Sequence, residues 1–480
     1  MSTPPSLRQR AVRNVGWAAV QKWFVRLSGV VTFVVLGRLL DPAEIGLAAL
    51  ALAAVGFLAV VADFGMSTYL VRSEDADRRR TSTVFWSTLV LGVLGALLLV
   101  LLSAPLAGAL GEPRAAPVLQ ALAGGLVVTT LTCVPAALLV RRMQFRALAA
   151  RGVAAAVVGS VVGISLALAG AGVWALVVQS LAQNGFSLVW FWAAARWRPA
   201  PVVSVEVLRD VWRVGSPVLG IDVVQAVRDR ADQLVVGGVA GVEVLGYWTV
   251  ATRLVGLVHE VAMSVMDLVA LPLFARLRGD LPRFTRAYET AGAMSTALLA
   301  PAVAVLAAVS PVVVPGLFGP QWEPAVLPAQ VLCVAYGVGA VGYFNRSALL
   351  AFDRAGTAWA VATASLVVHV GVLLVAAGWG LVALAWGHGL ASVLIVVGSA
   401  LVLRRTVGVG ASAYARSVRA LLAAVVALGP MLLLTGAVPG WAGAVLAAAV
   451  GAVVYGGLML LVNRRLVAEA LDDLRGLLRR

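Results

Sequence analysis

Reactive side chains are scarce in this chain of 480 residues, which has two cysteines and three histidines. The cysteines, Cys133 and Cys333, fall in apolar stretches, where a thiol behaves as a small apolar side chain, so a disulfide framework is not supported. A P-loop requires a Gly-Lys-Ser or Gly-Lys-Thr motif, and the only lysine, Lys22, is followed by Trp23. The sequence therefore excludes direct ATP hydrolysis by this chain.

Charge is the second shortage. Charged residues make up 12% of the chain and hydrophobic residues 61%, and the mean hydropathy is +0.97. This composition leaves too little polar surface to cover a soluble domain, and no polar connection is longer than about 20 residues. A soluble catalytic or nucleotide-binding domain is thereby excluded. We predict an all-α, polytopic membrane protein that is not an enzyme.

Metal-binding and cofactor motifs are also missing. His259-Glu260 is not followed by the second histidine that a zinc-binding helix carries four residues later. His369 and His388 are single imidazoles in apolar segments, and we expect them to be hydrogen-bonded packing residues. The sequence predicts no catalytic residue, no metal ligand and no cofactor.

Long apolar segments fill most of the chain. A membrane-spanning helix needs about 20 apolar residues. Windows of this length predict roughly fourteen spanning helices, with the limits 13–37, 43–70, 82–108, 115–140, 147–169, 172–195, 211–237, 245–273, 285–312, 325–350, 356–377, 380–403, 415–436 and 440–463.

Arginines fall almost entirely in alternate connections between these segments, as expected for cytoplasmic loops. The pattern supports an even number of spans with both termini in the cytoplasm. The formal charge of +15 and the pI of about 11.2 then reflect arginine near anionic lipid, and no nucleic-acid partner is needed. The arginine-rich connections include Arg8, Arg10 and Arg13; Arg78, Arg79 and Arg80; Arg141, Arg142 and Arg146; Arg196 and Arg198; Arg276, Arg278 and Arg283; and Arg404 and Arg405.

An internal repeat organises the helices. Three residues recur 200 positions later, pairing Gly46 with Gly246, Gly56 with Gly256 and Cys133 with Cys333. Six helices separate the copies, so both copies have the same orientation in the membrane, and two lobes face a central cavity as in alternating-access transporters. We predict an N-terminal six-helix lobe at 1–200, a C-terminal six-helix lobe at 201–405, and additional helices 13 and 14 with a cytoplasmic tail at 406–480.

Ionisable residues gather in the predicted helices 1, 2, 7 and 8, the equivalent helices of the two lobes. Charges at membrane depth are costly and mark substrate or ion pathways unless they pair with each other. Pairing within helix 7, or snorkelling of the helix 1 cations to the head groups, is the structural alternative. The ionisable residues are Lys22 and Arg26; Asp63; Asp222, Arg228, Asp229, Arg230 and Asp232; and Arg253, His259, Glu260 and Asp267.

Several motifs resemble those of a known family. The segment Leu36-Gly37-Arg38-Leu39-Leu40-Asp41-Pro42-Ala43-Glu44-Ile45-Gly46, with Asp63-Phe64-Gly65 after it, resembles the opening of the Wzx-type oligosaccharide flippases. Gly172-Val173-Trp174-Ala175-Leu176 and Gly319-Pro320-Gln321-Trp322 are similar to later segments of that family. The resemblance extends across the chain and places it in the superfamily of multidrug extruders and the lipid II flippase.

The resemblance implies export of an undecaprenyl-pyrophosphate-linked glycan from the cytoplasmic to the outer leaflet of a bacterial cytoplasmic membrane. Guanidinium groups match phosphate oxygens with paired hydrogen bonds, so Lys22, Arg26, Arg228, Arg230 and Arg253 are the predicted pyrophosphate ligands. Candidates for coupling to an H+ or Na+ gradient are Asp63, Asp222, Asp232 and Glu260.

Expected partners are the lipid-linked glycan, membrane lipids, a polysaccharide polymerase and glycosyltransferases. Three alternatives stay open at this point. A lipid II flippase shares the extra helix pair, a multidrug or cation extruder shares the architecture but should have an acidic or aromatic cavity, and a membrane scaffold would need no charges at the midplane.

Overall fold

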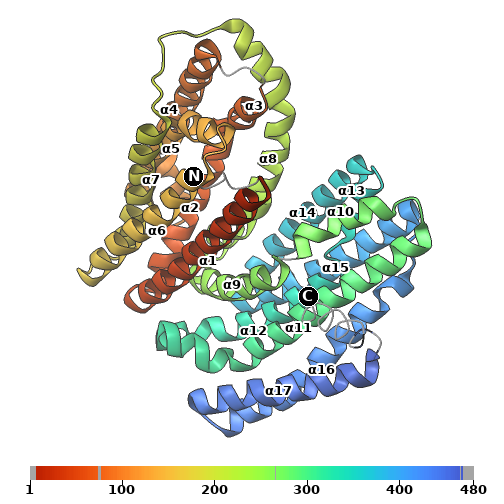
Figure 1. Ribbon diagram of the computed structural model, residues 1–480. Helices are drawn as coiled ribbons and strands as arrows, with labels where there is room; N and C mark the ends of the chain where they lie inside the picture. The colour runs from red at the N-terminus through yellow and green to blue at the C-terminus, as the bar shows by residue number, and fades with distance from the viewer. Residues whose placement is uncertain (1–6, 74–76, 265, 465, 467, 469–480) are drawn as a thin grey trace, which may run out of the picture. The chain divides into compact units, whose positions relative to one another are not determined.

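The computed structural model describes residues 7–73, 77–264, 266–464, 466 and 468 (Figure 1). Over these residues the chain is helical and contains no strand. It divides into two compact units, residues 1–246 and 247–480.

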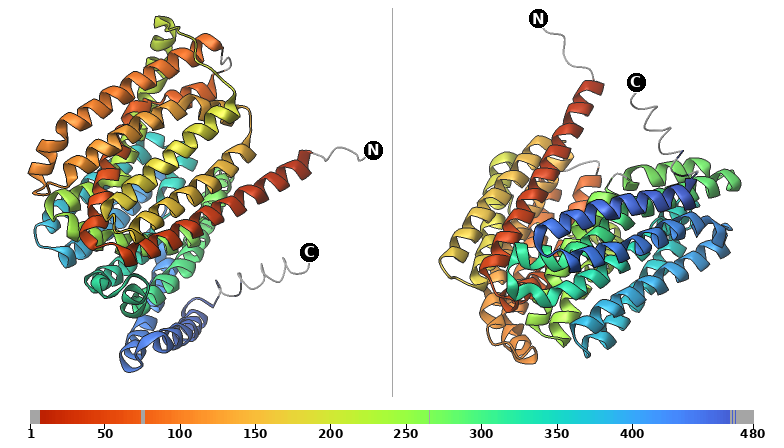
Figure 2. Two further views of the ribbon diagram at one scale, coloured as in Figure 1. Left: turned by 90° about the vertical axis from the view of Figure 1, so that its left-hand side faces the viewer. Right: turned by 90° about the horizontal axis from the view of Figure 1, so that it is seen from below.

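The first unit contains eight helices and the start of a ninth: α1 (Leu7–Leu39), α2 (Pro42–Asp63), α3 (Met66–Arg72), α4 (Arg78–Ala109), α5 (Ala115–Arg141), α6 (Phe145–Leu168), α7 (Val173–Ala195), α8 (Val205–Val239) and α9 (Val242–Met263). α5 is central, packing against α2, α3, α4 and α7, while α1 runs along α6 (Figures 1 and 2). Because α8 packs against α2, α3 and α4, contacts do not separate the chain at residue 200, and the two six-helix lobes stay a prediction.

The second unit takes up the rest of α9 and continues with α10 (Met266–Leu277), α11 (Leu281–Phe318), η1 (Pro320–Ala325), α12 (Val326–Val341), α13 (Asn345–Ala351), α14 (Ala355–Ala377), α15 (Leu381–Val407), η2 (Ala411–Tyr414), α16 (Ala415–Ala437) and α17 (Gly440–Val462). α11 is its longest helix and packs against α10, α12, α16 and α17. The two C-terminal helices, α16 and α17, pack side by side on α11.

Helix starts follow local sequence signals. Pro42 occupies the first turn of α2, and the carboxylate of Glu44 accepts a hydrogen bond from the backbone N–H of Asp41 at 3.1 Å. Asp77 caps α4 by accepting from the N–H of Arg80 at 2.8 Å, and Asp280 caps α11 in the same way. These caps satisfy N–H groups that a helix start leaves without partners.

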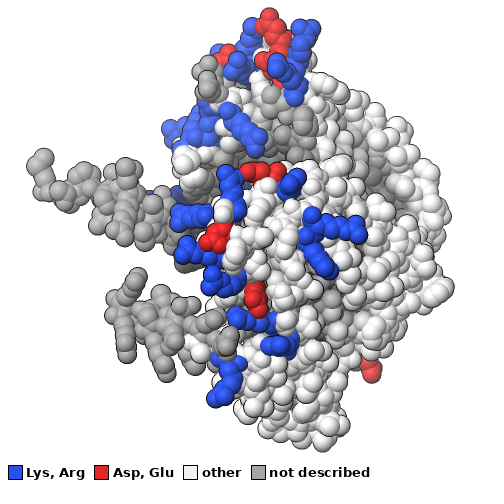
Figure 3. Space-filling model, turned by 90° about the vertical axis from the view of Figure 1, so that its right-hand side faces the viewer, with Lys and Arg blue, Asp and Glu red and all other residues white. Residues whose placement is uncertain are grey.

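All fourteen predicted spans fall on helices, three of them interrupted. Ten helical segments of the described chain are long and apolar enough to cross a membrane. The remaining four predicted spans correspond to α1, α7, α8 and α9, and three of these carry the ionisable residues noted above. The count of fourteen spans therefore stays a prediction. In Figure 3 the Lys and Arg side chains of the face in view are interspersed with Asp and Glu side chains, and most of the described surface in that view is uncharged.

The internal repeat is visible in the limits of the helices. α2 spans 42–63 and α9 spans 242–263, α3 begins at Met66 and α10 at Met266, and α1 and α8 end 200 residues apart at Leu39 and Val239. Each of the two copies interrupts its second spanning segment after the same residue. The break between α2 and α3 is formed by Phe64 and Gly65, whose φ angles are 48° and 68°. A glycine enters this left-handed region at little cost, whereas a phenylalanine does so only under strain.

Two repeat-related glycines meet inside the first unit. A Cβ atom on Gly46 would lie 1.7 Å from the carbonyl oxygen of Val242, and one on Gly246 would lie 1.9 Å from that of Pro42. The two contacts are reciprocal, because each joins a glycine to the first residue of the helix carrying the other glycine. Only glycine allows the backbones of α2 and α9 to approach this closely.

Candidate functional site

The guanidinium group of Arg230, on α8, lies against the backbone of α2 at Gly56. A Cβ atom at position 56 would be 2.4 Å from Nη2 and 2.6 Å from Nε of Arg230. Arg230 is half-buried. The absence of a side chain at Gly56 therefore makes room for a predicted phosphate ligand within the membrane-spanning part of the first unit.

The arginines of α8 are not neutralised within their helix. Among the described residues, no carboxylate lies within 4.0 Å of the guanidinium nitrogens of Arg228 or Arg230. Asp229 instead accepts a hydrogen bond from Gln225 Nε2 at 2.8 Å, and both Arg228 and Asp229 are exposed. The sequence left open that these arginines form ion pairs within α8, the seventh predicted span. The structure shows no such ion pair for Arg228 or Arg230, so both keep their hydrogen-bonding capacity.

Arg26 of α1 is half-buried and lies over the ring of Trp23, 5.2 Å from its centroid. Lys22 belongs to α1, but its side chain is outside the described ones.

Asp63 has the most elaborate surroundings of the predicted coupling residues. One oxygen, Oδ1, accepts hydrogen bonds from Ser67 Oγ at 2.5 Å and Cys133 Sγ at 3.1 Å. Asp63 is the last residue of α2, Ser67 lies in the first turn of α3 and Cys133 belongs to α5, so the break in the helix brings the hydroxyl and the thiol to the same oxygen. A carboxylate with two donors is held in one orientation.

Two other predicted acids, Asp222 and Asp232, lie on α8 and are half-buried. Asp222 is close enough to Asp63 for the two carboxylates to interact electrostatically. Both acids belong to the first unit.

The second unit holds the other two predicted residues, Arg253 and Glu260, which are exposed and two turns apart on α9. His259 contacts the rings of Tyr336 and Tyr343 at centroid distances of 5.4 and 5.6 Å. His388 contacts Tyr336, Trp248 and His369, the last at 5.0 Å. All three histidines of the chain thus make aromatic contacts within one unit.

Sequence reasoning missed two features of the first unit. Arg151 of α6 lies over the ring of Phe191 at 5.0 Å and donates to Ser187 Oγ at 3.3 Å. An arginine near the start of a span looks like a loop residue in a charge pattern, which is why it was not singled out. The second feature is the contact between Cys133 and Asp63, which no spacing along the chain could reveal.

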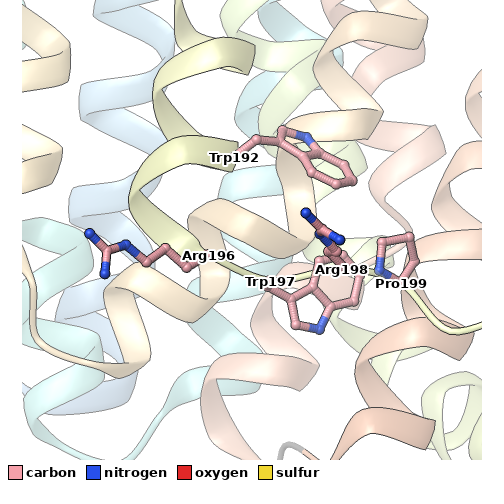
Figure 4. A pocket seen from close by; sticks show the side chains of 5 residues that line it. All are labelled: Trp192, Arg196, Trp197, Arg198 and Pro199. Carbon is pink, nitrogen blue, oxygen red and sulfur yellow. The ribbon is translucent and has the colours of Figure 1, made fainter.

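A cavity of about 660 Å³ opens where the chain leaves α7 (Figure 4). It is lined by Trp192, Arg196, Trp197, Arg198 and Pro199, and Arg196 points away from the other four side chains. One wall is held in place by a hydrogen bond between helices, because Trp192 Nε1 of α7 donates to the carbonyl of Leu131 in α5 at 3.0 Å. None of the predicted site residues lines this cavity.

A protein-family model described as "Polysaccharide biosynthesis protein" matches residues 35–327. The succinoglycan biosynthesis transport protein ExoT of Rhizobium meliloti is 29% identical over 70% of this chain and 68% of its own length. The lipopolysaccharide biosynthesis protein WzxC of Escherichia coli is 22% identical over 73% of this chain and 71% of its own length.

Two solved structures share the fold. The lipid II flippase MurJ in an inward closed conformation superposes with a TM-score of 0.75 at 13% identity, covering 94% of this chain and 99% of MurJ. An inward-facing multidrug transporter of the MATE family gives a TM-score of 0.62 at 16% identity, covering 80% of this chain and 94% of that transporter. At these identities the likeness concerns the fold alone, and it confirms the predicted class of polytopic, all-α membrane protein.

Proposed function

The chain belongs to the polysaccharide biosynthesis protein family, and from this premise we propose that it is a flippase that moves a lipid-pyrophosphate-linked oligosaccharide from the cytoplasmic to the outer leaflet by alternating access. Family and fold are those of transporters rather than of catalysts. The predicted resemblance to polysaccharide flippases is confirmed at the level of the family.

One observation carries the proposed substrate chemistry: Arg228 and Arg230 lie on α8, a predicted span, with no described carboxylate within ion-pair distance, and α2 makes room for the Arg230 guanidinium at Gly56. A partly buried charge such as that of Arg230, with no described carboxylate near it, is costly, which makes an anionic ligand the natural complement. A guanidinium stays charged when desolvated and binds phosphate oxygens in pairs. We assign Arg26, Arg228, Arg230 and Arg253, with Lys22, to the pyrophosphate.

The glycan would occupy the central cavity expected of an alternating-access transporter, while the polyprenyl tail stays in lipid. Coupling to an H+ or Na+ gradient is assigned to Asp63, Asp222, Asp232 and Glu260. Binding of the ion must favour one of the two transport states over the other, as any coupled cycle requires. The proposed location is the bacterial cytoplasmic membrane with both termini in the cytoplasm, and a polymerase and glycosyltransferases are the proposed partners.

Polymer export in a strain that lacks the native protein tests this function. Arg230→Ala should lower surface polysaccharide about 10- to 100-fold, because a hydrogen bond to a charged group contributes about 1.5–3 kcal/mol. The lipid-linked glycan should then accumulate on the cytoplasmic side. The matched control is Arg79→Ala, which removes an exposed arginine paired with Glu206 at 3.1 Å.

Membrane levels of each variant have to equal those of the wild type. Full polymer export by Arg26→Ala, Arg228→Ala, Arg230→Ala and Arg253→Ala, each tested singly, would defeat the pyrophosphate assignment. Rescue of peptidoglycan synthesis, but not of polymer export, would assign the chain to lipid II instead. Drug resistance without polymer export would assign it to the multidrug extruders.

A further inference from the structure

The second unit contains a cleft that the proposed transport cycle does not use. It has a volume of about 460 Å³, lies between α10 and α11 and is also lined by Arg416 of α16. Met266, Ala270 and Leu273 form one wall, and their spacing of four and three residues places them on one face of α10. Arg286, Thr290 and Met294 form the opposite wall, along one face of α11.

The polar and apolar parts of the cleft lie at different depths. Arg286 is near the start of α11, and Met294 follows eight residues later, about 12 Å further along the helix axis. α10 and α11 are joined by a turn of three residues, so Leu273 lies toward the turn and Met266 away from it. The turn and the start of α11 carry Arg278, Asp280 and Arg283, a pattern of the cytoplasmic surface. The cleft is thus charged near that surface and apolar deeper in the membrane.

Among the described side chains that line the cleft, the charges leave a net excess of one positive group. Arg416 Nε pairs with Glu289 Oε1 at 3.1 Å, and both side chains are three-quarters buried. Arg286 is exposed, and its Nε makes only a long contact of 3.4 Å with the carbonyl of Pro282. One of the two guanidinium groups in the cleft is therefore neutralised, and the other remains available to an anion.

The apolar walls that extend away from Arg286 are not those of a site for a small hydrophilic anion. Leu273 is 39% exposed and, with Met266 and Met294, supplies a thioether-rich apolar surface. Methionine side chains adapt to flexible apolar partners such as hydrocarbon chains. A ligand that satisfies both parts must have an anionic head and an apolar tail.

We propose that this cleft binds an anionic phospholipid of the cytoplasmic leaflet, with its phosphate on Arg286 and an acyl chain along Met266, Leu273 and Met294. The ion pair between Arg416 and Glu289 holds the start of α16 against α11 at the head-group end. Asn463 Nδ2 also donates to the carbonyl of Arg416 at 3.1 Å, so the end of α17 supports the same corner. A lipid bound here would tie α10 to the packed pair of α11 and α16. This proposal does not depend on the transported substrate.

Lipid titration of the full-length protein in detergent provides the test, with thermal unfolding as the readout. Phosphatidylglycerol should raise the Tm of the wild type, and phosphatidylcholine should not, because a ligand that binds only the folded state stabilises it. Arg286→Gln should raise the apparent Kd for phosphatidylglycerol about tenfold or more, as expected for the loss of a charge-assisted phosphate contact.

Arg283→Gln is the matched control, since Arg283 is one turn away on the same helix, pairs with Asp280 at 3.4 Å and does not line the cleft. Its apparent Kd should stay within about twofold of the wild type. Met294→Trp fills the apolar end of the cleft. It should weaken the binding of phosphatidylglycerol without removing a charge. Equal affinities in the wild type and Arg286→Gln would overturn the proposal. So would equal stabilisation by the two lipids, or stronger binding of a polyprenyl pyrophosphate at Arg286, which would assign the cleft to the substrate.

Discussion

The two copies of the interrupted helix, α2–α3 and α9–α10, have the same helix limits but differ in their polar side chains. Their limits coincide after a shift of 200 residues, and each breaks between positions 63 and 66 of its copy. At the break the first copy has Asp63, with two hydrogen-bond donors, where the second has Met263, which is 1% exposed. The Arg230 guanidinium lies against Gly56, whereas no atom of the described residues lies within 4 Å of where a Cβ of Gly256 would stand.

This difference teaches that the architecture is repeated while the polar site is not. A symmetric fold can move two halves against each other, but a substrate with one pyrophosphate needs only one set of ligands. Substitution of side chains that maintain the shared fold should therefore be equally destabilising in both copies. Those that serve transport should matter in one copy alone.

The largest effect is expected where the copies are truly equivalent, at Gly46 and Gly246. Alanine at either position would place a Cβ within 2 Å of a backbone carbonyl, which no rotamer can relieve. We expect each variant to lose about 3 kcal/mol of stability, at the upper end of overpacking costs. Thermal unfolding in detergent measures it, with Gly29→Ala as the control, since nothing lies within 4 Å of that position. A wild-type Tm for both variants would contradict the reciprocal contact.

Asp63 should be sensitive in a way that separates stability from transport. Asp63→Met introduces the residue that the second copy has at the equivalent position, Met263. The substitution removes the carboxylate that accepts from the Ser67 hydroxyl and the Cys133 thiol. This should cost about 1–2 kcal/mol in the free energy of unfolding. Asp63→Asn keeps an acceptor oxygen but no charge, so its Tm should stay near that of the wild type.

Polymer export by Asp63→Asn then reports on the charge itself. Loss of export with a normal Tm would support the coupling role, and normal export would remove Asp63 from it. If Asp63→Met proves as stable as the wild type, the two hydrogen bonds contribute nothing.

The sequence predicted the helices well because hydrophobic length and arginine placement act over whole segments. It did not predict the break at Phe64 and Gly65, since the apolar run continues through it and 43–70 therefore reads as one helix. It also identified Arg230 as a candidate without indicating its neighbour. The periodicity of one helix says which residues share a face, and packing decides that Arg230 meets Gly56. For the same reason Arg151 was overlooked.

Gly56 and Gly256 provide the next comparison. Gly56→Ala should displace the far end of a flexible arginine without disturbing the backbone, so the Tm should be unchanged. If Arg230 binds pyrophosphate, the affinity for a polyprenyl pyrophosphate should fall about tenfold, equivalent to about 1.4 kcal/mol. Gly256→Ala should keep the wild-type affinity, because its surroundings are open. Equal affinities in the two variants would show that the position of Arg230 does not matter.

The smallest expected effect concerns the turn between α4 and α5, outside the repeat-related breaks. Arg114 donates to both carboxylate oxygens of Glu112, at 2.7 and 3.0 Å, and this hydrogen bonding lowers the pKa of Glu112 below its ordinary value of 4.5. A lowered pKa in the folded state means that the pair stabilises the fold above pH 4.5 and that this contribution is lost as the pH falls through the folded-state pKa. The guanidinium of Arg114 is 59% exposed, so solvent screens the pair and the gain is small. The Tm difference between the wild type and Glu112→Gln should be constant near neutral pH and shrink below pH 4.5, whereas a difference unchanged down to pH 3 would mean that the charge of Glu112 plays no part.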